Sequence, residues 1–219
     1  MLKLFLKKFR ILLLNNQREI NLAKEISNII IEHSEKNEIS ILDYGSGFEP
    51  LIIKLIRKNL EKKKITLNSH CFDFYNDNEL IVLNKKNKEK FYKISDINKY
   101  NYKYDFVLIS DVLHHIGVEK TFLISNLLNN FKKKTKYIII KDHFEDILFS
   151  RQLLRFMDFI GNYYNNVNIP KKYYKQKDFE FFLTINKFKI IKKISKVNLY
   201  SKIFNFFSNP RLHFIYIIK

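Results

Sequence analysis

The stretch ISILDYGSG at residues 39–47 decides the fold, because a short apolar run ends there in an acid and a two-glycine turn. An apolar run bounded by glycines is typical of a buried strand followed by a tight turn. Pro50 then stands where the first turn of a helix tolerates proline, and apolar residues continue at helical spacing from Leu51 to Leu60. This order predicts a strand, a glycine turn and a helix.

The same alternation continues along the chain. Helical segments separate the further strands, which are expected near residues 65–74, 91–95, 104–110 and 136–141. The last two strands, near residues 188–196 and 212–218, are expected to pair through a short connection at residues 208–210. The sequence therefore predicts an α/β fold that is Rossmann-like and doubly wound, with a mostly parallel seven-stranded sheet and an antiparallel C-terminal hairpin.

The chain divides into a short leading segment and one domain. Residues 1–38 are expected to form an N-terminal helical segment packed on the domain of residues 39–219, because apolar positions from Ile20 to Ile30 recur at helical spacing. Residues 144–178 exceed an ordinary strand-to-helix connection. Their length favours a lid-like insertion, with a helix above the binding edge.

Lysines interrupt the leucine- and phenylalanine-rich residues 1–14, so this stretch is not expected to cross a bilayer or to act as a signal peptide. A basic amphipathic stretch can instead lie on an anionic membrane surface, which keeps peripheral contact with the inner membrane face as an alternative to packing on the domain. The single cysteine, Cys71, permits no internal disulfide and no cysteine-rich zinc site. A reducing, cytoplasmic location is therefore expected.

The composition is that of a folded domain with excess positive charge. The chain has 219 residues, 46% of them apolar, and 40 Lys and Arg against 22 Asp and Glu give a net charge of +18. This apolar content excludes a disordered chain. Most of the basic residues are lysines spread along the whole chain. Nucleic-acid recognition favours arginine and one clustered basic face, so a nucleic-acid partner is not expected.

Acids follow the apolar runs at the points where the expected strands stop: Asp43, Asp73, Asp96, Asp111 and Asp142. In an open parallel sheet, ligands bind outside the carboxyl ends of the strands. The glycine turn lets a backbone approach a ligand closely, and the helix after it presents free amide donors. A carboxylate at Asp73 is placed to accept both hydroxyls of a ribose. Together these features favour a nucleotide-like ligand.

Fingerprints of other nucleotide-binding and hydrolytic folds are missing. A dinucleotide fingerprint in the register of Gly45 and Gly47 needs a third glycine at position 50, where this chain has Pro50. No Gly-Lys-Ser/Thr follows the turn, and no Gly-x-Ser-x-Gly elbow occurs. These absences exclude P-loop phosphoryl transfer and serine hydrolysis and weaken an NAD-type oxidoreductase, which stays as an alternative.

Residues 41–47, Asp73, Ser95-Asp96 and residues 104–116 together resemble class I S-adenosylmethionine-dependent methyltransferases over about residues 39–145. The resemblance implies S-adenosylmethionine as the cofactor. It implies that the methionine part is lined by Asp43, Tyr44, Gly45, Ser46 and Gly47. The other implied cofactor residues are Asp73 for the ribose hydroxyls with Phe74 next to it, Asp96 and Ile97 for the adenine, and Ser110, Asp111 and Val112 below the pocket. The family often has a third glycine at position 49, where this chain has Glu49.

Histidines after the strands are candidates for a proton acceptor, because their unperturbed pKa lies near working pH. His114 and His115 are sequence neighbours that point in different directions on a helix, and His115 is taken as the catalytic candidate of the two. His143 is predicted to be catalytic with Asp142 as its orienting acid. No ligand spacing demands a metal, and none is predicted.

Lys141-Asp142-His143-Phe144 and residues 154–162, with residues 212–214, are similar to a bacterial branch of the same family that acts on small molecules. Within that stretch Arg155, Asp158 and Asn162 are polar residues among apolar ones and are predicted to contact the substrate.

The sequence as a whole predicts transfer of a methyl group to a small-molecule or lipid-like acceptor. Nucleic-acid methylation is kept as an alternative. It is the lesser one, because no Asn/Asp-Pro-Pro-Tyr/Phe motif follows the fourth strand. No obligate protein partner is implied.

Overall fold

The computed structural model describes residues 16–100, 102–162, 169–200 and 209–219. The chain begins there with α2 (Gln17–His33), β1 (Glu38–Tyr44), α3 (Leu51–Glu61), β2 (Thr66–Asp73), α4 (Asp77–Lys86), β3 (Lys90–Lys93) and β4 (Tyr104–Ser110). It continues with α5 (Leu113–Ile116), α6 (Thr121–Lys132), β5 (Thr135–His143), α7 (Ser150–Asn162), α8 (Gln176–Ile185), β6 (Ile190–Ile194) and β7 (His213–Ile218).

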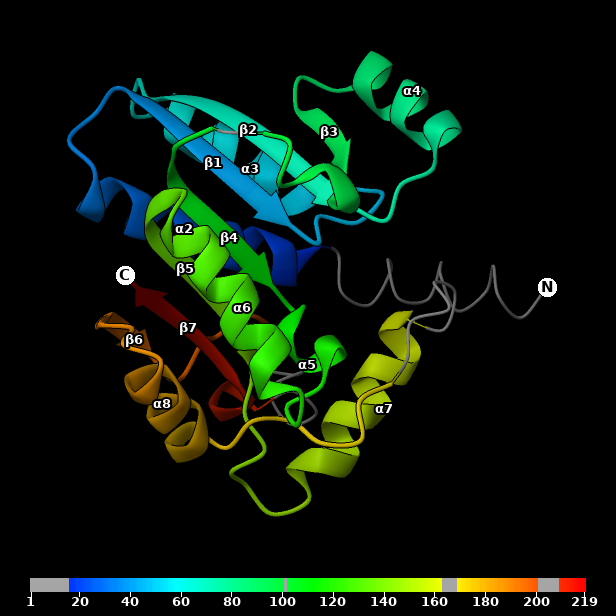
Figure 1. Cartoon of the computed structure of the whole chain (residues 1–219), viewed down its shortest axis with the longest axis vertical. Helices are drawn as coiled ribbons and strands as arrows, with labels where there is room; N and C mark the ends of the chain where they lie inside the picture. Colours follow the sequence, from blue (N-terminus) through cyan, green and yellow to red (C-terminus); the bar gives the residue numbers. More distant parts are fainter. Residues whose placement is uncertain (1–15, 101, 163–168, 201–208) are drawn as a thin grey trace.

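Seven strands form one sheet in the order β3-β2-β1-β4-β5-β7-β6 (Figure 1). The five strands from β3 to β5 in this order pair in parallel, whereas β7 is antiparallel to both β5 and β6. The predicted α/β class is confirmed, including the mostly parallel seven-stranded sheet and its antiparallel C-terminal pair.

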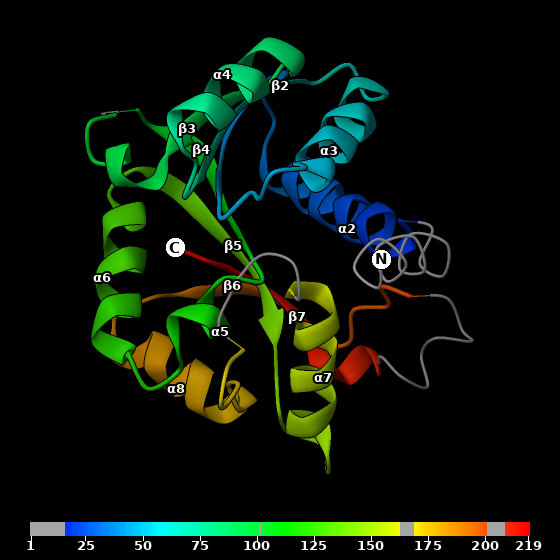
Figure 2. The same cartoon turned by 90° about the vertical axis from the view of Figure 1, so that its right-hand side faces the viewer.

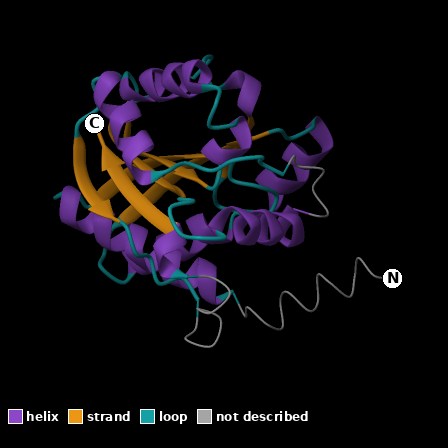
Figure 3. Cartoon of the chain, turned by 90° about the horizontal axis from the view of Figure 1, so that it is seen from below, coloured by secondary structure: helices purple, strands orange, loops and turns teal. Residues whose placement is uncertain are grey.

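Helices cover both faces of the sheet (Figure 2, Figure 3). α2 and α3 lie on one face, and α6 and α8 lie on the other. Side chains of β4 alternate between the two cores: Leu108 belongs to the core beside α2 and α3, whereas Val107 and Ile109 belong to the core beside α6 and α8. This alternation explains why the central strands read as nearly continuous apolar runs.

The helix predicted from the apolar spacing after Ile20 is present as α2. Its buried stripe includes Leu22, Ala23, Ile26 and Ile30, whereas Ile20 itself is exposed. Through this stripe α2 joins the core on its side of the sheet. No helix in the described part of the chain is long and apolar enough to cross a membrane.

The connection between the last two strands is longer than expected. Residues 195–212 join β6 to β7, so the predicted short connection at residues 208–210 was wrong. Val197 and Leu199 are buried in the core beside α2, and the N–H of Val197 donates to the carbonyl of Pro210 at 3.2 Å. Burial of these two side chains holds the connection against that face of the sheet, a long-range effect that local spacing does not reveal.

Candidate active site

Acidic residues gather at the carboxyl edge of the parallel strands. Asp43 lies one residue before the end of β1, and Asp73 ends the neighbouring β2. Asp96 closes a short 3-10 turn after β3, Asp111 directly follows β4, and Asp142 is the next-to-last residue of β5. Because parallel strands bring their carboxyl ends to the same edge, the five acids singled out by the sequence lie along that edge.

The two-glycine bend after β1 is fixed by hydrogen bonds to the end of β2. The N–H of Gly45 donates to the carbonyl of Phe72 at 2.8 Å, and the N–H of Gly47 donates to the carboxylate of Asp73 at 2.6 Å. Gly45 has a φ of 78° and Gly47 a φ of 69°, a left-handed conformation that favours glycine. A Cβ on Gly45 would lie 2.4 Å from Cγ2 of Val112. The bend therefore packs tightly against the loop after β4.

Asp43 titrates far from the usual range of an aspartate. Its side chain is buried, and burial together with the charge of Asp73 raises the pKa of Asp43 to about 7. A positive charge placed next to two neighbouring acids is attracted by both and favours their ionised form. The pair is suited to hold a cationic group.

Aromatic side chains surround the glycine bend. Phe74 is largely exposed and Phe48 is half exposed, although both are large apolar residues. The hydroxyl of Tyr75 donates to the carbonyl of Gly47 at 2.5 Å and lies 2.7 Å from the hydroxyl of Ser46. Exposed aromatic faces beside a pair of acids offer stacking surfaces for a flat heteroaromatic ligand.

Two of the predicted cofactor residues, Tyr44 from the methionine part and Ile97 from the adenine part, lie toward α6. Tyr44 packs edge-on against Phe131 with 5.2 Å between the ring centroids. Tyr44 and Ile97 line a hollow of about 350 Å³ together with residues of α6. The carboxylate of Asp96 pairs with Lys99 at 2.7 Å. The structure thus brings Tyr44 and Ile97 to one hollow, whereas Asp96 is engaged by its own turn.

Asp111 is the centre of an ion-pair cluster. Its carboxylate accepts hydrogen bonds from Arg18 of α2 and Lys141 of β5, and Nε2 of His143 lies 3.0 Å from it. Burial raises the pKa of Asp111, but the charges of Lys141 and Arg18 hold it well below its usual range. The carboxylate that the resemblance assigns to the cofactor pocket is therefore bound to α2 and β5. Beside it, the hydroxyl of Ser110 is buried with no hydrogen-bond partner among the described residues.

Arg18 and Lys141 belong to the candidate site through Asp111, although the sequence did not single them out. Lys141 is fully buried within the apolar strand β5, and a lysine inside such a run is a signal for a buried charge with a partner. Arg18 gives no comparable signal, because its partner Asp111 lies 93 positions away in the sequence.

His114 is held between two carboxylates. Its Nδ1 lies 2.5 Å from Oδ1 of Asp142, and its Nε2 lies 3.5 Å from Oδ2 of Asp158 on α7. The hydroxyl of Tyr173 donates to the same carboxylate of Asp158 at 2.5 Å. Burial lowers the pKa of His114, but Asp142 and Asp158 outweigh burial and raise it. The arrangement favours the imidazolium form of His114.

The pKa of His143 is shifted in the opposite direction to that of His114. Burial and the charge of Lys141 lower the pKa of His143, although its Nε2 meets Asp111. Its Nδ1 is buried and has no hydrogen-bond partner within the described residues. Neighbouring titratable groups whose pKa values are pushed apart mark acid and base positions in enzymes.

The pairing of acids and histidines differs from the prediction. Asp142 was expected to orient His143, but its carboxylate accepts from the ring of His114 and from the backbone N–H of His143. Neighbouring strand residues point to opposite faces, so the ring of His143 meets Asp111 instead. His115, the predicted catalytic residue of its pair, is partly exposed, and its ring centroid lies 4.1 Å from that of His114.

Each acid of the cluster has a basic partner. Asp111 pairs with Arg18 and Lys141, whereas Asp142 and Asp158 both lie beside His114. Asp111, His114, Asp142 and His143 bring atoms that could ligate a metal within 4.8 Å of one another. A divalent cation there would join two cations already bound to Asp111, an arrangement opposed by Coulomb repulsion.

The predicted substrate residues are divided between the two sides of α7. Asp158 is buried against His114, whereas Arg155 is exposed. Asn162 is the last residue of α7, and its side chain lies outside the described part of the structure. Of the three, Asp158 meets the histidine cluster.

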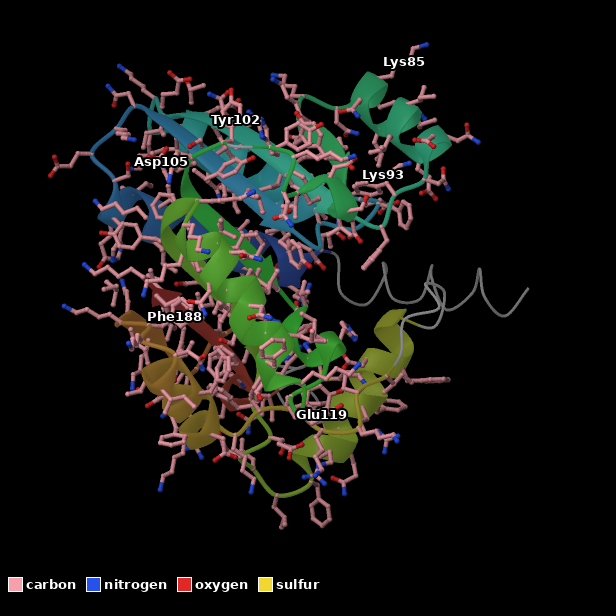
Figure 4. The ribbon with its side chains drawn as sticks, viewed as in Figure 1. Lys85, Lys93, Tyr102, Asp105, Glu119 and Phe188 are labelled. Atoms are coloured by element: carbon pink, nitrogen blue, oxygen red, sulfur yellow. The ribbon has the colours of Figure 1, made fainter. Side chains whose placement is uncertain are left out.

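A larger hollow, of about 810 Å³, lies at the opposite edge of the sheet. Tyr102 and Asp105 line it at the amino end of β4 (Figure 4). Glu119, between α5 and α6, marks the opposite end of the molecule in the same view. Lys36 pairs there with Asp105, and Arg57 pairs with Glu89 at 3.0 Å. None of the five strand-end acids lines this hollow.

No protein-family model matches the sequence, and no curated protein matches it. Among solved structures, a cyclopropane-fatty-acyl-phospholipid synthase-like protein from Lactobacillus casei superposes with a TM-score of 0.59 at 11% identity, over 93% of this chain and 90% of that one. A SAM-dependent methyltransferase from Archaeoglobus fulgidus gives 0.52 at 17% identity, over 90% and 94% of the two chains.

The mitomycin 7-O-methyltransferase MmcR superposes with a TM-score of 0.58 at 13% identity. The match covers 93% of this chain and 53% of that one, so this chain spans about half the length of MmcR. At these identities the similarities establish the fold. The chain has the architecture of S-adenosylmethionine-dependent methyltransferases, as the resemblance implies.

Proposed function

We propose that this protein transfers a methyl group from S-adenosylmethionine to a small-molecule or lipid-like acceptor. The observation that carries the proposal is the glycine bend after β1, where the buried acid Asp43 feels the charge of Asp73 and Asp73 accepts the N–H of Gly47. The fold shared with methyltransferases supports the same reaction class.

The residues at the bend fit the parts of the cofactor. Asp73 presents a carboxylate for the ribose hydroxyls, and Asp43 offers a buried acid for a cationic group. Phe74 offers an exposed aromatic face beside them. When bound, the cofactor would supply a methyl group activated by a sulfonium. Most of the catalysis can then come from holding the acceptor at attack distance.

The histidine cluster fits the acceptor side of such a reaction. The pKa of His143 is lowered by burial and by Lys141, which favours the neutral ring, and its Nδ1 has no partner among the described residues, so it can take a proton from a hydroxyl acceptor. Asp111 accepts from the other nitrogen of that ring and holds its tautomer. His114 is fixed by Asp142, which raises its pKa, so its ring can stabilise negative charge that develops nearby when it is protonated.

The proposal is tested by calorimetric titration with S-adenosylhomocysteine. The wild-type chain should bind it and should not bind NADH, which separates a methyltransferase from an NAD-type oxidoreductase. Asp73→Ala should lose about 1–3 kcal/mol of binding free energy, because ribose hydroxyls would lose their acceptor. Asp77→Ala is the matched control, since Asp77 is exposed and pairs with Lys93 on the surface.

Equal affinity of the Asp73 variant and the wild type would remove the ribose assignment. Binding of NADH in place of S-adenosylhomocysteine would overturn the proposed reaction class. We also propose a cytoplasmic location, because a single cysteine fits a reducing compartment.

A further inference from the structure

The outer face of α7 and the turn before it expose large apolar side chains. Leu148 is 81% exposed, Phe149 70% and Phe156 59%. These three residues are called the α7 outer surface below. α7 itself stands at the margin of the molecule, at the carboxyl edge of the sheet (Figure 1, Figure 2). Exposed apolar side chains that gather in one patch mark protein or membrane interaction sites.

The inner face of the same helix is fully anchored. Leu154 is buried in a small core with Tyr173 and Leu212. Asp158 follows one turn later. Its Oδ2 lies 3.5 Å from Nε2 of His114 and accepts a hydrogen bond from the hydroxyl of Tyr173. Phe156 lies between Leu154 and Asp158 in sequence, which turns it to the opposite side of the helix. The exposure of Phe156 therefore belongs to a helix whose other side is already packed.

The turn before α7 holds a phenylalanine in a costly conformation. Phe149 has a φ of 62°, a left-handed value that bulky residues rarely adopt. Its carbonyl accepts the N–H of Leu153 at 3.1 Å, so the residue is built into the start of the helix. Strain of this kind persists where the surroundings impose it, and it is concentrated at functional segments. Here it presents an exposed aromatic ring beside α7.

Positive charge accompanies the apolar surface. Arg155 of α7 is exposed, and so are Lys171 and Lys172, which directly precede Tyr173 of the small core. Arg151 is paired bidentately with Glu145, at 2.8 and 2.6 Å, and is locally compensated. An exposed arginine next to Phe156 on the same helix complements the interface of a membrane that carries anionic lipids.

We propose that the α7 outer surface docks on an anionic lipid membrane and that the methyl acceptor is an amphiphile delivered from it. The second half rests on the proposed function, because it takes the histidine cluster as the reaction site. The same helix carries Phe156 on the docking side and Asp158 on the side of His114. One helix diameter, about 10 Å, then separates the membrane surface from the cluster.

Co-sedimentation with lipid vesicles tests the docking. The full chain should bind vesicles of phosphatidylcholine mixed with phosphatidylglycerol more tightly than vesicles of phosphatidylcholine alone. Phe149→Asn and Phe156→Gln should each weaken binding to the mixed vesicles about tenfold or more, since each removes a ring that would enter the interface. Asn tolerates the left-handed φ of Phe149, so the first variant should fold at least as stably as the wild type.

Matched controls are exposed phenylalanines on other helices. Phe122 of α6 is 73% exposed and Phe181 of α8 is 67% exposed. Phe122→Asn and Phe181→Gln should leave vesicle binding unchanged. Arg155→Glu should reduce binding to the mixed vesicles and leave the residual binding to neutral vesicles as it is, because Arg155 acts by charge.

Several results would overturn the docking proposal. Absence of wild-type binding to mixed vesicles is one, and unchanged binding of both α7 variants is another. Binding that survives these variants but is lost on removal of residues 1–10 would assign the contact to the N-terminus. A wild-type dimer that Phe149→Asn dissociates would make the surface an interface between copies. Titration with S-adenosylhomocysteine on the same samples keeps the two proposals separate, because the α7 variants should retain cofactor affinity.

Discussion

Gly45 and Val112 meet so closely that a single methyl group does not fit between them: a Cβ on Gly45 would lie 2.4 Å from Cγ2 of Val112. This approach joins the bend after β1 to the loop after β4. It also fixes the bend whose next glycine, Gly47, donates to Asp73. The shape of the candidate cofactor site therefore depends on the absence of one side chain.

Gly45→Ala should disturb the site far more than Gly47→Ala. Both positions have positive φ, but the space around a Cβ on Gly47 is open, whereas Gly45 faces Val112. We expect Gly47→Ala to cost about 1 kcal/mol of folding stability and Gly45→Ala to cost about 1–3 kcal/mol more. Urea denaturation measures both. Val112→Ala in the Gly45→Ala background should recover part of the loss, and its failure to do so would refute the steric explanation.

Ligand binding should release a proton from Asp43. The pKa of Asp43 is raised to about 7 by burial and by Asp73, so the carboxyl is mostly protonated at about pH 6. A bound cationic group would lower that pKa and expel the proton. Titration with S-adenosylhomocysteine in two buffers of different ionisation enthalpy should show the release at about pH 6 and not at about pH 9. Asp43→Asn should abolish it, and buffer-independent heats in the wild type would contradict the assignment.

The same acid should weaken the fold above neutral pH. Because the folded pKa of Asp43 is about 7 against 3.8 for the free group, the folded state holds a proton that the unfolded chain releases. Stability contributed by the protonated carboxyl is therefore lost as pH rises between these values. Asp43→Asn should raise the melting temperature at about pH 8 relative to the wild type. An unchanged or lower melting temperature would show that the buried charge is compensated.

Removing only one charge of the ion pair between Asp111 and Lys141 should lower the folding stability. Asp111→Asn tolerates the φ of 56° at this position but leaves the fully buried Lys141 without a negative charge to pair with. We expect a loss of about 3–5 kcal/mol in urea denaturation. Lys141→Met in the Asp111→Asn background should recover part of it, since both charges are then gone. Additive losses in the double variant would show that the two residues are not coupled.

His114 should stabilise the fold at low pH and lose this contribution as the pH rises. Its folded pKa is raised by Asp142 and Asp158, so its contribution is complete below about pH 6.5 and is lost as pH rises through the folded pKa. Asp142→Asn should flatten this dependence and lower the imidazole pKa measured by NMR titration. As a control, Asp105→Asn removes an acid at the opposite edge of the sheet and should leave the NMR titration of His114 as it is.

Elements and strand-end acids were predictable from local pattern. The apolar run before Asp43 and the glycine bend after it specify a strand and a turn whatever the rest of the chain does. Once alternating strands imply a parallel sheet, Asp73 must lie at the same edge as Asp43, because parallel strands share their direction. The fold class and the identity of the acidic edge followed from these two steps.

The partners of those acids were not predictable in the same way. The sequence offered Asp142 as the partner of His143, but the alternation of β5 turns the two side chains apart and brings His114 to Asp142. Arg18 reaches Asp111 only because α2 packs back on the sheet. The connection after β6 likewise follows the burial of Val197.

By itself the sequence determined which residues form strands and helices and which acids close the parallel strands, because both depend on short-range periodicity. Only the tertiary structure decided that Lys141 is buried against Asp111, that His114 lies between Asp142 and Asp158, and that one face of α7 is left uncovered. Charges and exposed faces are settled by neighbours far apart in the chain, and the pKa values that give the site its chemistry follow from that burial.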